Sequence, residues 1–188
     1  MTEAMPARAL ILAAGRGERM RPLTDPCPKP LLTVRGKPLM QWHMEALARG
    51  GCTGLVVNTA WLGEQISSHF GPQALWDGHG ALSISYSDEG RDFGGALETA
   101  GGIVRALPLL DEVFWVAAGD VFAPDFRFAP EALARFRAGN ALAHLWLVPN
   151  PAHNPKGDFG LGEDGRARNV PADTSGPRYT FSTIGLYR

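Results

Sequence analysis

The turn that follows the first apolar segment carries the residues best suited to bind a polyanion. Residues 9–13 form a short apolar run, which indicates a strand buried on both faces. The chain then turns through small residues, whose backbone amides can approach a ligand closely and form an anion nest. Cationic side chains lie in or beside this turn: Arg16, Arg19 and Arg21. Amides and guanidinium groups at the carboxyl end of a strand suit a polyphosphate.

Two common phosphate-binding patterns do not fit this turn. The dinucleotide pattern Gly-x-Gly-x-x-Gly fails because Met20 occupies the third glycine position, and this disfavours a Rossmann oxidoreductase. The Walker pattern fails because no Gly-Lys-Ser/Thr follows. A plain strand-to-helix turn with solvated arginines is the alternative interpretation.

Lys29 and Asp120 are further candidates for phosphate chemistry. Lys29 lies between two prolines that hold the backbone extended, and its ammonium group could reach an α-phosphate or a sugar phosphate. Its alternative is a surface lysine in a Pro-rich loop. Asp120 comes just past a buried run at residues 113–118, where loops converge on a ligand. Its alternative is a turn-forming residue after Gly119.

Strand and helix patterns alternate along most of the chain. Further strands are predicted at residues 54–58, 82–86, 113–118 and 143–148, and helices at 39–49, 62–70, 98–107 and 130–137. This order predicts a Rossmann-like, three-layer α/β/α arrangement with a mostly parallel central sheet. After Pro149, short predicted strands at 157–161, 167–170 and 179–187 indicate a β-rich C-terminal portion.

Composition limits the classes of function. The chain has 188 residues with 45% hydrophobic content, which suits a globular domain, and its net charge of -1 gives no reason to expect nucleic acid or a membrane as partner. Two cysteines without a CxxC pattern predict a reducing compartment. We see no signal peptide and no run long enough to span a bilayer, so we expect a cytoplasmic protein.

The turn and the lysine loop together form a more specific motif than either part alone. LAAGRGERMRPLT followed by PKPLL resembles the signature of the nucleotide-sugar pyrophosphorylases, which are sugar-1-phosphate nucleotidyltransferases. VNTAWL at 57–62, LETAGG at 97–102 and AGDV at 118–121 resemble later segments of the family in the same order. The resemblance covers about residues 8–187 and thins after Asn150. It implies the glycosyltransferase-A-like nucleotidyltransferase fold.

Within this family the chain is most similar to the bacterial N-acetylmuramate-1-phosphate uridylyltransferases of cell-wall peptidoglycan recycling. NTAWLG at 58–63, Asn150-Pro151 and KGDF at 156–159 carry that similarity. The implied substrates are UTP and a sugar-1-phosphate, and the implied assembly is a monomer or a homodimer. Mannose-1-phosphate guanylyltransferases share much of the rest and remain an alternative. A regulatory module that binds nucleotide without turnover is another.

The resemblance implies a role for each matching position. Arg19 would stabilise the pyrophosphate leaving group, Lys29 would bridge the two reacting phosphates, and Asp120 would hold Mg²⁺, the implied cofactor. The implied nucleotide-binding residues are Leu12, Ala13, Ala14, Gly15, Arg16, Gly17, Glu98 and Thr99. The weaker sugar-binding candidates are Asn150, Asp158 and Ser182. A helix N-terminal cap is an equal alternative for Glu98 and Thr99, and turns or strand edges are alternatives for the sugar candidates.

Two features depart from the family pattern. Residues 91–95 look longer than the family's loop before the Leu-Glu-Thr motif. The family also has a later metal-binding aspartate, beyond the strand predicted at 179–187, and the sequence reaches only Arg188. We expect one nucleotidyltransferase domain over residues 1–188, with a nucleotide-binding part at about 8–150. Its sugar-binding part, at about 151–188, would be shortened at its C-terminal end.

Overall fold

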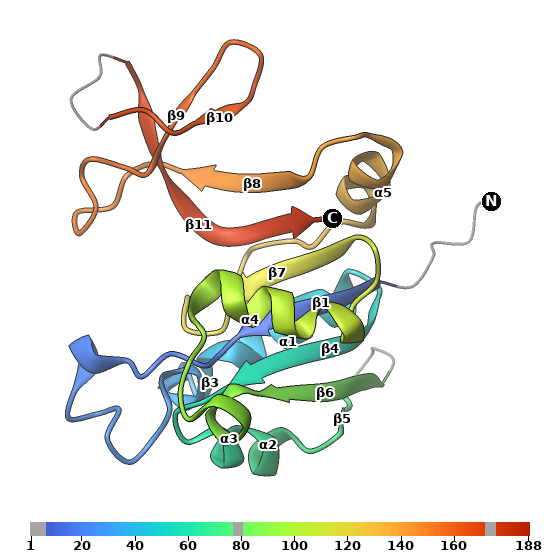
Figure 1. Cartoon of the computed structure of the whole chain (residues 1–188), viewed down its shortest axis with the longest axis vertical. Coiled ribbons are helices and arrows are strands. Elements are labelled where there is room, and N and C mark those ends of the chain that lie inside the picture. Colours follow the sequence, from blue (N-terminus) through green and yellow to red (C-terminus); the bar gives the residue numbers. More distant parts are fainter. Residues whose placement is uncertain (1–6, 77–80, 172–175) are drawn as a thin grey trace.

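Four parallel strands form the centre of the main sheet (Figure 1). The computed structural model describes residues 7–76, 81–171 and 176–188. The central strands are β1 (Ala7–Leu12), β4 (Cys52–Thr59), β6 (Leu82–Asp88) and β7 (Phe114–Ala118). β1 pairs with β4 and with β7, and β4 pairs with β6. The central strands are nearly continuous apolar runs because helices cover both faces of a parallel sheet.

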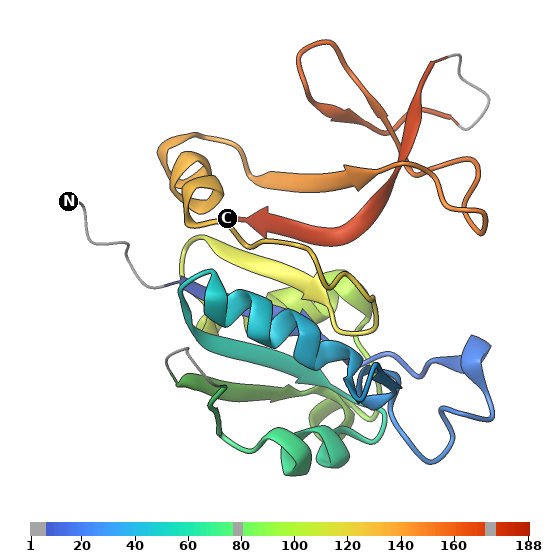
Figure 2. The same cartoon turned by 180° about the vertical axis from the view of Figure 1, so that it is seen from behind.

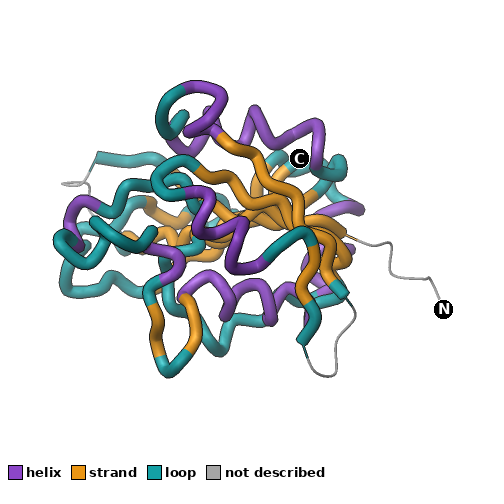
Figure 3. Tube along the Cα trace, turned by 90° about the horizontal axis from the view of Figure 1, so that it is seen from below, coloured by secondary structure: helices purple, strands orange, loops and turns teal. Residues whose placement is uncertain are grey.

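Helices α1 (Leu39–Arg49) and α4 (Glu98–Ala106) lie on opposite faces of this sheet (Figures 1 and 2). Met40, Met44 and Leu47 recur at helical spacing in α1 and are fully buried in the core cluster that contains Ile11. Residues of α4 pack in a second cluster with the neighbouring Leu10. Viewed from below, the strands lie between the helical layers (Figure 3). The predicted three-layer arrangement with a mostly parallel sheet is confirmed.

Shorter elements complete the central part of the fold. They are η1 (Glu18–Met20), η2 (Lys29–Leu31), β2 (Thr33–Val34), β3 (Lys37–Pro38), α2 (Gly63–Phe70), β5 (Gln73–Ala74), α3 (Glu89–Phe93), η3 (Leu107–Leu109) and α5 (Pro130–Ala138). Residues 91–95, predicted as a long loop, thus contain the end of α3. Asp88 starts this helix, because its side chain accepts a hydrogen bond from the amide of Arg91.

Antiparallel strands extend the sheet beyond β7. They are β8 (Ala143–Val148), β9 (Phe159–Leu161), β10 (Ala167–Arg168) and β11 (Arg178–Tyr187). β11 pairs with β7, and along its length it also pairs with β8 and β9. These strands form the orange and red part of Figure 1. The predicted β-rich C-terminal portion therefore belongs to the same sheet as the parallel strands.

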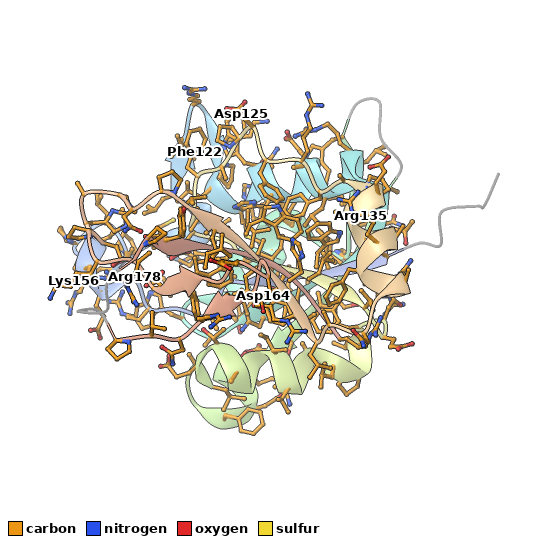
Figure 4. The ribbon with its side chains drawn as sticks, turned by 90° about the horizontal axis from the view of Figure 1, so that it is seen from above. Phe122, Asp125, Arg135, Lys156, Asp164 and Arg178 are labelled. Carbon is orange, nitrogen blue, oxygen red and sulfur yellow. The ribbon has the colours of Figure 1, made fainter. Side chains whose placement is uncertain are left out.

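Arg178 ties the loop before β9 to β11. Its guanidinium group donates hydrogen bonds to the carbonyl oxygens of Lys156 at 2.8 Å, Gly157 at 3.1 Å and Asp158 at 3.0 Å. Figure 4 shows Arg178 beside Lys156 at one end of the molecule. Within the described ranges, no helix has both the length and the hydrophobicity required to cross a membrane.

Candidate functional site

A cavity of about 770 Å³ opens where β1, β4 and β7 end. Its wall is formed by the glycine turn (residues 13–17), the lysine loop (residues 28–32), the start of α4 and part of β11. The lining residues are Leu12, Ala13, Ala14, Gly15, Arg16, Gly17, Glu18, Lys29, Pro30, Asn58, Ala96, Glu98, Thr99, Ile103, Val116, Ala118, Asp120, Phe181, Thr183 and Tyr187. A smaller cavity of about 600 Å³, between α1 and α5, contains none of the predicted site residues in its wall. Clefts at the carboxyl ends of parallel strands are the usual ligand sites of such sheets.

The glycine turn lies against the lysine loop. Gly17 has φ of 69°, a left-handed conformation that glycine adopts without a steric penalty. A Cβ atom at this position would lie 3.0 Å from the Thr24 methyl carbon and 3.3 Å from the Lys29 Cβ. Glycine at position 17 therefore permits both the turn and the approach of Lys29.

The partly buried side chain of Arg16 stabilises the turn through contacts with neighbouring residues. Its guanidinium group donates hydrogen bonds to Asp25 at 2.6 Å and to the carbonyl oxygen of Thr24 at 2.9 Å, and it lies 3.8 Å from the centre of the Trp61 ring. The hydrogen bond from Arg16 lowers the pKa of Asp25 below its usual value, and the charge of Arg21 adds to this shift. The guanidinium of Arg16 is thus already paired where it borders the cavity.

The other two arginines of the turn lie differently. Arg21 forms an ion pair with Asp25 at 2.9 Å and is exposed. Arg19 is exposed in η1 and does not line the cavity. Of the three predicted cations, the structure brings Arg16 to the cavity wall, and it leaves Arg19 at the surface.

Lys29 and Asp120 meet across the cavity wall. Lys29 Nζ lies 2.8 Å from Asp120 Oδ2, and the two side chains are 23% and 37% exposed. Lys29 begins η2, and Asp120 follows β7 after Gly119. The amide of Gly119 donates a 2.9 Å hydrogen bond to the carbonyl oxygen of Leu12. This bond joins the loop that carries Asp120 to the end of β1.

His43 supports the same loop from α1. Its side chain is 1% exposed, and Nε2 lies 2.8 Å from the carbonyl oxygen of Val121, the residue after Asp120. Burial lowers the pKa of His43 below the ordinary value of 6.5, so the ring is neutral near pH 7 and donates from Nε2. The burial of His43 and its bond to the backbone of this loop indicate a structural role.

The start of α4 forms the opposite wall. Glu98 and Thr99 line the cavity there, and Glu98 has a positive φ of 59°. Leu97 occupies the N-cap position, and its side chain makes no capping hydrogen bond. Its amide instead donates a 2.7 Å hydrogen bond to Glu89 Oε2. Glu98 and Thr99 therefore do not act as the N-cap, which was their alternative interpretation.

The three sugar-binding candidates lie outside the cavity wall. Asn150 donates to the carbonyl oxygen of Arg178 at 3.1 Å, and Asp158 Oδ2 accepts from the amide of Phe181 at 2.8 Å. The hydroxyl of Ser182 accepts a 3.3 Å hydrogen bond from the amide of Ile184. Their observed contacts are those of turn and strand-edge residues.

Residues from β11 form a side of the cavity that the sequence motifs did not indicate. Phe181, Thr183 and Tyr187 line it. Thr183 has φ of 64°, within an irregularity of the β11–β8 pairing between Phe181 and Gly185, and its buried hydroxyl has no hydrogen-bond partner among the described residues. Strained backbone of this kind is common at functional sites. Asn58, near the end of β4, also lines the cavity, and a polar residue at the end of a buried strand is a sequence signal for such a position.

The donor set can be tested against the implied Mg²⁺. Mg²⁺ prefers oxygen ligands and is usually held by one or two carboxylates together with substrate phosphates. Asp120 supplies such a carboxylate at the cavity wall, and its side chain is accessible. Among the described residues there is no group of three or more acidic, His or Cys side chains that would hold a metal alone. The site therefore fits a cation that is completed by a bound phosphate.

Known proteins resemble this chain in sequence and in fold. The sequence model of the nucleotidyl transferase family matches residues 8–171. N-acetylmuramate alpha-1-phosphate uridylyltransferase from Neisseria meningitidis serogroup B is 50% identical over 187 residues, covering 96% of this chain and 75% of that protein. UTP–glucose-1-phosphate uridylyltransferase from Synechocystis is 38% identical over 60% of this chain and 30% of that protein.

Solved structures show the same fold. A UDP-glucose pyrophosphorylase complexed with UDP-glucose superimposes with a TM-score of 0.71, at 17% identity, over 97% of this chain and 76% of that one. The match to the family's sequence model extends from β1 through β7 to the loop before β11, and so includes both Lys29 and Asp120. The chain therefore belongs to the nucleotidyl transferase family.

Proposed function

We propose that this chain transfers a uridylyl group from UTP to N-acetylmuramate α-1-phosphate and releases pyrophosphate. The observation that carries the proposal is the meeting of Lys29 and Asp120 at a cavity that the glycine turn also lines. The choice of base and sugar is supported by the 50% identity to the Neisseria enzyme over nearly the whole chain. Such a reaction belongs to peptidoglycan recycling in the cytoplasm, and two free cysteines agree with a reducing compartment.

The reaction is a displacement at phosphorus. An oxygen of the sugar phosphate attacks the α-phosphorus of UTP, a new P–O bond forms, and the bond to the departing pyrophosphate breaks. Both reactants are anions, so the site must offset charge and hold the attack in line. Lys29 is the cation best placed for this, because its ammonium group borders the cavity beside Asp120.

The glycine turn and the start of α4 would hold the nucleotide between them. Backbone amides at Ala14, Gly15 and Gly17 can face phosphate oxygens, as in other anion nests. Glu98 and Thr99 lie on the facing wall, where the base and ribose would contact them. Arg19 is exposed beside the turn and free of ion pairs among the described residues, so its side chain can move to the pyrophosphate as that group leaves.

Asp120 would hold Mg²⁺ together with the phosphates of the triphosphate. The cation would neutralise charge that develops on the α-phosphate and the leaving group. Lys29, which is hydrogen-bonded to the same carboxylate, keeps Asp120 oriented before substrate binds.

The sugar would lie against the β11 side of the cavity. Phe181, Thr183 and Tyr187 line this side, whereas Asn150, Asp158 and Ser182 support the loops and the strand behind it. This division keeps the nucleotide-binding part at about residues 8–150 and assigns the sugar-binding part to residues after 150.

A substrate panel tests the proposed function. Pyrophosphate release is measured with UTP, GTP and dTTP, each combined with N-acetylmuramate α-1-phosphate, mannose-1-phosphate and glucose-1-phosphate. We expect the highest kcat/KM with UTP and N-acetylmuramate α-1-phosphate. A preference for GTP and mannose-1-phosphate would assign the chain to the guanylyltransferases instead. Binding of nucleotide without pyrophosphate release from any pair would indicate a regulatory module.

A further inference from the structure

Glu89 is a buried carboxylate outside the cavity wall. It is 0% exposed, and no cation among the described residues forms an ion pair with it. A buried charge without a counter-ion is costly unless hydrogen bonds satisfy its oxygens. Here Glu89 Oε1 accepts from Asn58 Nδ2 at 2.8 Å, and Oε2 accepts from the amide of Leu97 at 2.7 Å.

These bonds form part of a longer hydrogen-bond chain. Asn58 Oδ1 accepts a 2.7 Å hydrogen bond from the amide of Ala13, in the glycine turn. The hydrogen-bond chain therefore runs from Ala13 through Asn58 and Glu89 to Leu97. Its two ends belong to the two walls of the cavity between which the nucleotide is proposed to bind.

The backbone of α4 lies close to this hydrogen-bond chain. A Cβ atom on Gly102 of α4 would lie 2.6 Å from Asn58 Nδ2 and 2.7 Å from Glu89 Oε1, so only glycine lets α4 approach the pair. At the other end, Leu97 precedes Glu98, whose φ of 59° is in the left-handed region. The hydrogen bond to Glu89 holds the amide directly before this strained residue, and it thereby fixes where Glu98 and Thr99 enter the cavity wall.

We propose that Glu89 is a positioning residue for the nucleotide: acting through Asn58 and Leu97, it fixes the separation of the glycine turn and the start of α4. This inference rests on the proposed function in taking a nucleoside triphosphate as the ligand between these walls. It implies that loss of Glu89 weakens nucleotide binding, whereas Lys29 and Asp120, in other loops, keep their arrangement.

The test compares Glu89→Gln with Glu45→Gln. Glu45 is also a carboxylate that accepts hydrogen bonds, from Lys37 and Gln41, but it is only partly buried, and it lies outside the cavity wall. The carboxamide introduced by Glu89→Gln has one oxygen, which can replace one of the two accepting carboxylate oxygens, so one bond of the chain is lost. We expect the KM for UTP to rise at least about tenfold, with kcat and the KM for the sugar phosphate within about twofold. An unchanged KM for UTP, or an equal rise in Glu45→Gln, would overturn the proposal.

The double variant Asn58→Asp with Glu89→Gln provides a rescue. The introduced aspartate can accept from the amide of Ala13 and from the NH₂ group of the introduced glutamine. The glutamine oxygen can then accept from the amide of Leu97, so every bond of the chain has a donor and an acceptor again. We expect the KM for UTP of the double variant to fall back towards the wild-type value. A double variant no better than Glu89→Gln would contradict the role of the chain.

Amide hydrogen exchange in the free protein separates this inference from the proposed function. Glu89→Gln should accelerate exchange at Leu97 if the Gln oxygen faces Asn58, or at Ala13 if Asn58 turns its oxygen to the Gln NH₂ group. Unchanged exchange at both amides would overturn the inference whatever the substrate proves to be. Failure of wild-type protein to release pyrophosphate would reject the proposed function and leave the exchange result standing.

Discussion

Lys29 Nζ lies 2.8 Å from Asp120 Oδ2, although 91 residues separate the two side chains in sequence. The segment between β1 and α1 carries Lys29, and the loop after β7 carries Asp120. The two meet because β1 and β7 are parallel neighbours. Carboxyl ends of parallel strands converge on one edge of the sheet, so residues distant in sequence can share one ligand. The proposed catalysis depends on this juxtaposition of Lys29 and Asp120.

Substitution of Lys29 should abolish efficient turnover without unfolding the protein. In Lys29→Ala we expect kcat to fall by about 10²–10³-fold, because the site loses a cation aimed at the reacting phosphates. The pair with Asp120 is partly exposed, so its loss should change the free energy of unfolding by less than about 1 kcal/mol. Lys37→Ala is the matched control, since Lys37 pairs with Glu45 outside the cavity wall. Wild-type kcat in Lys29→Ala would refute its role.

Substitutions of Arg16 and Arg19 should have different effects, the first on stability and the second on catalysis. Arg16→Ala removes hydrogen bonds to Asp25 and Thr24 and the stacking on Trp61, and it should lower the free energy of unfolding by about 1–2 kcal/mol. Arg19→Ala should leave the melting temperature unchanged, because Arg19 is exposed, while lowering kcat by about tenfold or more. Thermal unfolding and steady-state kinetics measure both. Normal kcat in Arg19→Ala would remove this residue from the mechanism.

Gly17 should be intolerant of a side chain for two reasons that a control can separate. Gly17→Ala places a methyl group against Thr24 and Lys29 and also strains a left-handed backbone. Gly36→Ala imposes the same kind of backbone strain at φ of 83°, but no atom lies within 4 Å of the new Cβ. It should therefore lower the free energy of unfolding by only about 1–2 kcal/mol, from the strain alone. We expect Gly17→Ala to lose more stability and most of its activity. Equal effects in the two variants would show that contact with the lysine loop is unimportant.

His43 should make the protein less stable in acid. Its folded-state pKa lies below the ordinary value of 6.5, so the unfolded chain takes up this proton first as the pH falls. The contribution of His43 is therefore fully present above about pH 7.5. It is lost progressively as the pH falls through 6.5 towards the folded pKa. Each unit of lowering is equivalent to about 1.4 kcal/mol.

Urea denaturation between about pH 5 and pH 8 measures this effect. His43→Gln can still donate to the carbonyl oxygen of Val121 but cannot take up a proton, so its stability should vary less with pH than that of wild type. His153→Gln, at an exposed histidine, is the control and should follow wild type. Parallel profiles for His43→Gln and wild type would contradict the assignment.

Much of the fold was predictable because buried parallel strands and amphipathic helices have strong local patterns. The helix predicted at residues 39–49 is α1 with the same bounds, and the strand predicted at 143–148 is β8. The helix predicted from residue 62 begins one residue later, because Leu62 has φ of 50°. Helix α3 was missed, since its five residues span little more than one turn and present no periodic apolar face.

The candidate site was predictable where a single loop carries the signal. The glycine turn, Lys29, Asp120, Glu98 and Thr99 all line one cavity, as their order in the family motif suggested. The β11 side of the cavity was not predictable, because it depends on the pairing of β11 with β7, which sequence alone does not fix. The hydrogen-bond chain through Glu89 was also not predicted. A glutamate in a short helix is expected to be exposed to solvent, and only the structure shows that Glu89 is buried.

The most direct test of the central claim is the rate of pyrophosphate release with UTP, N-acetylmuramate α-1-phosphate and Mg²⁺ in wild type and in Asp120→Asn. Asp125→Asn, at an exposed aspartate of the same loop, is the matched control. We predict rapid Mg²⁺-dependent release in wild type and in Asp125→Asn, and a loss of about 10²-fold or more in Asp120→Asn. A wild-type rate in Asp120→Asn, or release from wild type that persists after chelation of divalent cations, would contradict the proposed site.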